Sequence, residues 1–237
     1  HNGPSHPELL DYLADEFASH SFDLKQLMSW IVLSEPYSLS SRTIESNAVD
    51  DPLLGESPKF THFYLRQMTA EQLYESLLVA TQAHKSRGSF EEQEELKNKW
   101  LQQFITAFGT DEGDETTTFN GTIPQTLMMF NGEMIKQAVE LKEGSFLAEI
   151  AASPKLSAPR KFEYLFLAGL SRRPNRIEVR AANQLLDTHS RPTVPTSRGD
   201  GRWNESQSKE EAEDPVAATL QDMWWAILNS NEFILVH

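Results

Sequence analysis

Four carboxylates stand within five residues, in the segment TDEGDETTT that begins at residue 110. They are Asp111, Glu112, Asp114 and Glu115, and carboxylate oxygens are ligands that calcium prefers. An EF-hand would place its ligands at regular alternate positions and end on a distant bidentate Glu, and that pattern is absent. The alternative is an acidic loop before a helix N-terminus, where the macrodipole favours negative charge. We interpret the segment as a helix start that could also hold calcium.

A second candidate is the Asn131–Gly132 pair inside the apolar run TIPQTLMMFNGEM. Thr122 and Gln125 have the spacing of a capping box, so the pattern predicts a helix through this run. Glycine within a helix costs about 1 kcal/mol relative to alanine. Either close packing against another helix or a ligand that contacts the Asn131 amide would explain the pair.

Two neighbouring arginines in LSRRPNRIE form a third candidate. Arg172 and Arg173 could clamp an anionic ligand, because guanidinium groups bind carboxylates and phosphates in a bidentate geometry. The structural alternative is that one of them pairs with Glu178 or bonds the last carbonyls of a helix. The histidines lack HExxH spacing and no serine stands in GxSxG, so the sequence assigns no catalytic residue.

The composition describes a globular chain and excludes several classes of site. A formal net charge of −14 argues against nonspecific binding to nucleic acid, which requires clustered Lys and Arg. The absence of Cys excludes thiolate zinc sites, iron–sulfur clusters and a CxxCH haem attachment within these residues. No apolar run is long enough to span a bilayer. We therefore expect no transmembrane segment and no haem or other cofactor in this chain, with calcium as the one possible ion.

Hydrophobic periodicity predicts helices almost throughout, hence an all-α, irregular multi-helix domain with long loops. SHPELLDYLADEF and FDLKQLMSWIVL read as an antiparallel helical hairpin, and Thr69 with Gln72 and Ser89 with Glu92 have capping-box spacing. The pair Trp224–Trp225 is interpreted as core and docking tail rather than as a platform for sugars.

Two polar segments without apolar period divide the predicted helices. Residues 38–60 read as a surface loop, and residues 188–214 read as a flexible linker. We expect a helical domain over residues 1–187 and a C-terminal helix and tail over residues 215–237 that dock on the same domain.

Six stretches, in chain order, carry a family resemblance. They are PSHPELLDYLADEF, LKQLMSWIVLSEPYSLSSR, RQMTAEQLYESLLVAT, GTIPQTLMMFNGEMI, LFLAGLSRRPNRIE and WWAILNSNEFILVH. Together they resemble the C-terminal domain of unknown function of large exported proteins of planctomycetes and related bacteria, which often also contain a cytochrome-c-like module. The resemblance implies an exported, periplasmic or cell-envelope setting and an N-terminal portion that is missing from this chain.

The resemblance favours a non-catalytic interaction or accessory module of an exported multidomain or multisubunit protein. Its expected partner is the missing N-terminal part of the parent protein or a cytochrome-like subunit, and any haem would lie there. We expect a ligand on a surface near His6, Arg42, Arg66 and the acidic segment. Two alternatives remain open, namely a cation-dependent enzyme acting on polysaccharide and a structural subunit of a membrane-associated assembly.

Overall fold

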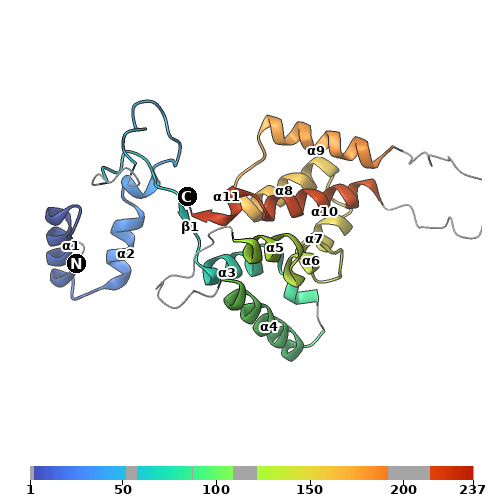
Figure 1. Cartoon of the computed structure of the whole chain (residues 1–237), viewed down its shortest axis with the longest axis horizontal. Coiled ribbons are helices and arrows are strands. Elements are labelled where there is room, and N and C mark those ends of the chain that lie inside the picture. The colour runs from blue at the N-terminus through green and yellow to red at the C-terminus, as the bar shows by residue number, and fades with distance from the viewer. Residues whose placement is uncertain (1–2, 52–57, 87, 109–121, 192–213, 237) are drawn as a thin grey trace, which may run out of the picture. The chain divides into compact units, whose positions relative to one another are not determined.

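The computed structural model describes residues 3–51, 58–86, 88–108, 122–191 and 214–236. Within these ranges the regular elements are helices apart from two strands of two residues each, so the all-α prediction is confirmed (Figure 1). Contacts divide the chain into two compact units, residues 1–66 and residues 67–236. The acidic segment and most of the predicted linker lie outside the described residues. No helix among the described residues is long and apolar enough to cross a membrane.

The first unit begins with the predicted helical hairpin. Helix α1 (Pro7–Ser19) packs against α2 (Leu24–Val32), and a short 3₁₀ helix, η1 (Pro36–Ser38), follows. Asp23 caps α2, because its side chain accepts a hydrogen bond of 3.1 Å from the Gln26 amide. The helical hairpin that the sequence predicts is therefore present.

The remainder of the first unit is organised around one buried carboxylate, which the sequence did not single out. Asp50 is only 4% exposed, and its two oxygens accept hydrogen bonds from four donors. These are the Lys59 and Thr61 amides, each at 2.9 Å, the Thr61 hydroxyl at 2.6 Å and the Tyr64 hydroxyl at 2.7 Å. Burial raises the pKa of Asp50, but these donors lower it more, so its net pKa lies well below the ordinary value.

Replacing Asp50 with Asn should destabilise this part of the first unit. It should also make the free energy of unfolding depend less on pH below about 3.8. A carboxyl whose pKa is depressed by folding stabilises the fold above its ordinary pKa of 3.8, and that stabilisation is lost as pH falls below this value. Hydrogen exchange of the Lys59 and Thr61 amides should become faster in the variant at pH 7. Unchanged exchange at both amides would contradict the assigned role.

The second unit holds the remaining helices and the small sheet. Its elements are β1 (Arg66–Gln67, at the boundary), α3 (Ala70–Thr81), η3 (Ala83–Ser86), α4 (Phe90–Phe108), α5 (Ile123–Asn131), α6 (Glu133–Val139), α7 (Phe146–Ala152), α8 (Ala158–Leu170), α9 (Arg176–His189), α10 (Pro215–Leu228), α11 (Asn231–Ile234) and β2 (Leu235–Val236). Strand β1 pairs with β2. The capping boxes predicted at the starts of α3 and α4 are confirmed, since both reciprocal hydrogen bonds are present in each.

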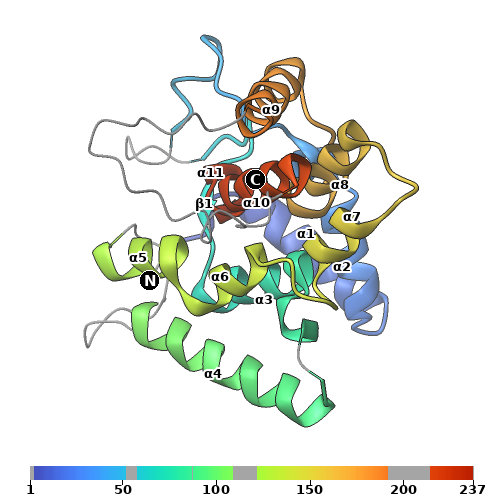
Figure 2. The same cartoon turned by 90° about the vertical axis from the view of Figure 1, so that its right-hand side faces the viewer.

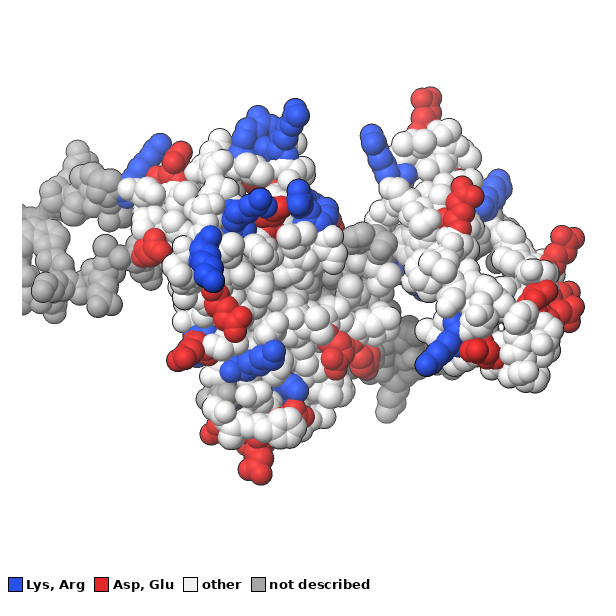
Figure 3. All heavy atoms as spheres, turned by 180° about the vertical axis from the view of Figure 1, so that it is seen from behind, with Lys and Arg blue, Asp and Glu red and all other residues white. Residues whose placement is uncertain are grey.

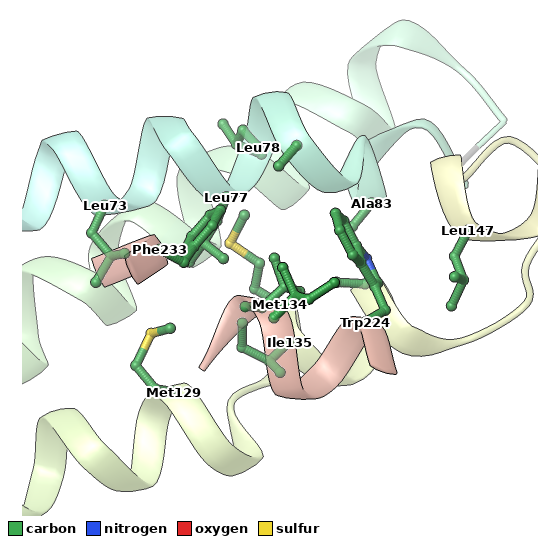
Figure 4. Packing of buried hydrophobic residues seen from close by; sticks show 14 of the residues in the cluster. Leu73, Leu77, Leu78, Ala83, Met129, Met134, Ile135, Leu147, Trp224 and Phe233 are labelled. Carbon is green, nitrogen blue, oxygen red and sulfur yellow. The ribbon is translucent and has the colours of Figure 1, made fainter. Parts of the chain in front are cut away.

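Helix α10 is the central element of the second unit. It packs against α6, α7, α8, α9 and α11, and Figure 2 shows it between the pair α8 and α9 on one side and α3 and α6 on the other. Figure 4 shows buried side chains from α3, α5, α6, α7, α10 and α11 that belong to one hydrophobic core, with Met134 near Trp224 of α10. Trp224 is fully buried, which confirms the core role predicted for it, whereas Trp225 is 39% exposed. Its indole donates to the Phe130 carbonyl at 3.3 Å.

The helix predicted to run through Asn131 and Gly132 is broken there, which corrects the sequence interpretation. Gly132 ends α5 and precedes α6, with φ −59° and ψ 151°. A Cβ at Gly132 would lie 2.4 Å from the Met128 carbonyl oxygen. Glycine is needed because the chain turns tightly against its own helix rather than against a neighbouring helix.

Candidate functional site

The hairpin of the first unit contains an open, mostly apolar groove of about 960 Å³. Its apolar lining includes Leu9, Tyr12, Leu13, Trp30, Ile31 and Leu33. Leu9, Tyr12 and Leu13 belong to α1, whereas Trp30 and Ile31 belong to α2. The groove therefore lies between the two helices of the hairpin.

No residue of α1 or α2 is buried, although both helices are amphipathic. Leu33 is 84% exposed, Leu9 is 55% exposed and Ile31 is 42% exposed. Isolated exposed leucines are normal, but a contiguous exposed apolar surface marks an interaction site or a binding groove. The arrangement can therefore accept an apolar segment of another molecule.

One end of the groove is polar. Glu16 of α1 and His20, which follows α1, both line it, with 3.6 Å between His20 Nδ1 and Glu16 Oε2. The His20 ring also stands edge-on against the Trp30 indole, with 4.9 Å between the ring centroids. This end offers a carboxylate and an imidazole beside an aromatic surface.

A second, smaller apolar pocket of about 310 Å³ lies in the second unit among α8, α9, α10 and α11. Phe166, Leu170, Leu185 and Ile227 contribute to its apolar wall. Three carboxylates, those of Glu178, Asp222 and Glu232, also line it. Each of these carboxylates contacts a basic side chain of the same unit, Arg172 or His189.

Arg172 binds two of these carboxylates in bidentate fashion. Its guanidinium donates to both oxygens of Glu178, at 2.7 and 2.9 Å, and to both oxygens of Glu232, at 2.5 and 2.6 Å. These hydrogen bonds, first to Glu232 and then to Glu178, raise the pKa of Arg172, and the bond from Arg172 lowers the pKa of Glu178. The pairing with Glu178 that the sequence suggested is confirmed.

The other residues that the structure describes around this pocket form no recognisable catalytic arrangement. His189 Nε2 lies 2.9 Å from Asp222 Oδ2, but the Ser230 hydroxyl donates to the Ile227 carbonyl at 2.7 Å and caps α11. No group of three or more His, Asp or Glu among the described residues could hold a metal ion. Calcium at the acidic segment stays a prediction, because Asp111, Glu112, Asp114 and Glu115 lie outside the described residues.

The remaining predicted ligand residues are distributed over both units. His6, Arg42 and Arg66 belong to the first unit and are exposed, and the His6 ring lies 5.5 Å from that of Phe60. Asn131 is exposed at the end of α5, and Arg173 pairs with Glu163 at 2.9 Å. A ligand site that joins these residues stays a prediction.

Charge is unevenly distributed along the chain. Residues 155–191 contain eight Lys and Arg against three Asp and Glu, although the whole chain has a net charge of −14. Figure 3 shows basic side chains gathered over the part of the second unit where Figure 1 places α8 and α9. The acidic excess therefore lies elsewhere, including the hairpin.

Comparison with known proteins gives a family without a described activity. The family model PSD1, a protein of unknown function (DUF1553), matches residues 1–186. No curated protein and no solved structure matches the chain. The match spans the first unit and continues through the second unit into α9.

Proposed function

Because the chain belongs to the PSD1 (DUF1553) family of proteins of unknown function, we propose a function from its site: it is a module that binds another protein through the hairpin groove. The observation that carries this proposal is the groove between α1 and α2, in which several apolar lining side chains, such as those of Leu9, Ile31 and Leu33, stay exposed. Fully burying one side chain of this size stabilises a complex by roughly 1.5–3 kcal/mol before the costs of association. Several such side chains are enough for a specific interface.

We further propose that this module works in an exported protein, in the periplasm or cell envelope. The support is the resemblance of the six ordered stretches to planctomycete-type exported proteins. The expected partner is the remainder of the parent protein or a c-type cytochrome-like subunit that holds any haem.

The native assembly tests this proposal directly. A tagged chain purified from its source cells without chelator should sediment as a particle larger than 26.9 kDa, the mass of the chain itself. A Soret band in the same particle would identify a haem partner. A colourless particle of the mass of one chain would contradict the proposal.

A variant of the groove should release the chain from that particle. Replacing Leu9 with Gln and Leu33 with Asn removes two exposed apolar contacts without changing charge, and should weaken association by at least about tenfold. Val79→Gln is the matched control, since Val79 lies on α3 in the second unit and is 74% exposed. Equal loss of association in both variants would show that the groove is not the interface.

A further inference from the structure

The hairpin that forms the groove of the first unit is acidic. Residues 7–36, which form the hairpin and the turn after it, contain six Asp and Glu against one Lys. Four of the six stand on α1, namely Glu8, Asp11, Asp15 and Glu16. A partner that approaches the groove therefore meets a concentrated negative field.

Most of these carboxylates form no ion pair within the described part of the chain. Asp23 caps α2, and Glu16 lies near His20. Glu8, Asp11 and Asp15 make no ion pair with any residue that the structure describes. Their carboxylates remain available to cations from outside.

We propose that the occupant of the groove is an amphipathic helix of a protein partner, apolar on the face that enters the groove and rich in Lys or Arg along its edges. The inference rests on the proposed binding function and specifies the chemistry of the partner. A third helix fits because a two-helix hairpin with an open apolar face is completed by helix packing against both members. One basic side chain reaches Glu16 at the polar end of the groove. The net negative charge of the hairpin attracts the other basic side chains at longer range.

The charge also disfavours two other occupants. A second copy of the chain would bring the same acidic hairpin and a net charge of −14 against this one. An anionic lipid surface would be repelled in the same way. A basic helix gains from both the apolar and the charged parts of the surface.

Two synthetic peptides test the inference on the full chain. Both are fluorescent idealised amphipathic helices of about five turns with identical leucine faces, one with Lys and one with Glu on the polar face. Fluorescence anisotropy in 0.15 M salt should show the Leu/Lys peptide binding at least about tenfold more tightly than the Leu/Glu peptide. The preference should shrink at 0.5 M salt, because exposed charges are screened.

Variants separate the groove from the general acidity of the chain. The Leu9→Gln, Leu33→Asn double variant should weaken Leu/Lys binding by at least about tenfold. Glu16→Gln removes the carboxylate that lines the groove and should weaken binding about twofold to fivefold. Val79→Gln should leave it unchanged. Equal loss in the groove variant and in Val79→Gln would overturn the inference.

Three other outcomes would also overturn it. Equal binding of both peptides would mean that charge does not select the partner. If the chain forms a dimer as its concentration rises, and this dimer competes with the peptide for binding, the groove would be assigned to a second copy. Binding to phosphatidylglycerol vesicles that the groove variant abolishes would assign it to lipid. Any of these results would contradict the proposal that the occupant is a basic helix. The proposed binding function of the groove would still hold if formation of the native particle depends on Leu9 and Leu33.

Discussion

Replacing Gly169 with valine should lower the free energy of unfolding of the second unit by about 2–3 kcal/mol. Gly169 lies in α8 where this helix crosses α10. A Cβ there would stand 2.6 Å from Ile227 Cγ2 and 3.2 Å from Trp224 Cζ3. Neither side chain can move away easily, because Ile227 is 5% exposed and Trp224 is fully buried.

Urea unfolding followed by circular dichroism measures this effect. Gly88→Val is the control. Among the described residues a Cβ at Gly88 meets only the Glu92 carboxylate, at 3.5 Å, so this variant should change stability by no more than about 0.5 kcal/mol. Gly169→Ala should fall between the two, since alanine gains helix propensity and keeps part of the overlap. Equal stability of the two valine variants would show that α8 and α10 do not approach so closely.

The features that the sequence predicted well are those specified by nearby residues. The capping boxes of α3 and α4 each depend on two residues three positions apart, and the pattern is visible in the sequence. The hairpin also follows from local signals, namely apolar spacing and the cap at Asp23. Local chemistry is therefore enough for the all-α class and for most helix starts.

The features that the sequence did not give depend on contacts between distant residues. Glu232 lies 60 positions after Arg172, so nothing near either residue indicates that they bond. Asp50 accepts hydrogen bonds from residues as distant as Tyr64. The composition of a polar loop does not show which of its donors and acceptors will bond to each other. The break at Gly132 arises because its backbone lies against the Met128 carbonyl, a steric reason that hydrophobic periodicity cannot show.

The groove illustrates a different limit of sequence reasoning. Apolar spacing placed Leu9 and Ile31 on the inner faces of two helices, where burial is the usual expectation. The structure shows both more than 40% exposed, because a two-helix hairpin can cover only part of each stripe. Hydrophobic periodicity indicates that one face of a helix is apolar. It does not indicate whether that face is buried by another element of the same unit or by a partner.

Replacing Arg172 with methionine should destabilise the second unit by about 2 kcal/mol. Methionine keeps the contact with the Phe166 ring, over which the guanidinium carbon now stands at 5.5 Å. It leaves the carboxylates of Glu178 and Glu232 without their shared cation. Hydrogen bonds between charged groups contribute about 1.5–3 kcal/mol, and we take the lower part of this range because the Arg172 side chain is 35% exposed.

The pH dependence of stability distinguishes this ion network from simple packing. Because Arg172 lowers the pKa of Glu178, the pair stabilises the fold above the ordinary glutamate pKa of 4.5 and loses this effect as pH falls below it. The free energy of unfolding should therefore fall less steeply below pH 4.5 in Arg172→Met than in the wild type. If the free energy of unfolding falls equally steeply below pH 4.5 in both proteins, the ion network would be contradicted.

Two further variants complete the test. Arg173→Met should be nearly neutral, since the Arg173 side chain is 77% exposed and pairs only with Glu163 among the described residues. Adding Glu178→Gln and Glu232→Gln to Arg172→Met should recover part of the lost stability, because breaking an ion pair leaves uncompensated charge and neutral partners remove it. Recovered stability together with a weaker loss of stability at low pH would show that charge joins the segment between α8 and α9 to α9 and α11. Further loss of stability would show that the carboxylates act through other partners.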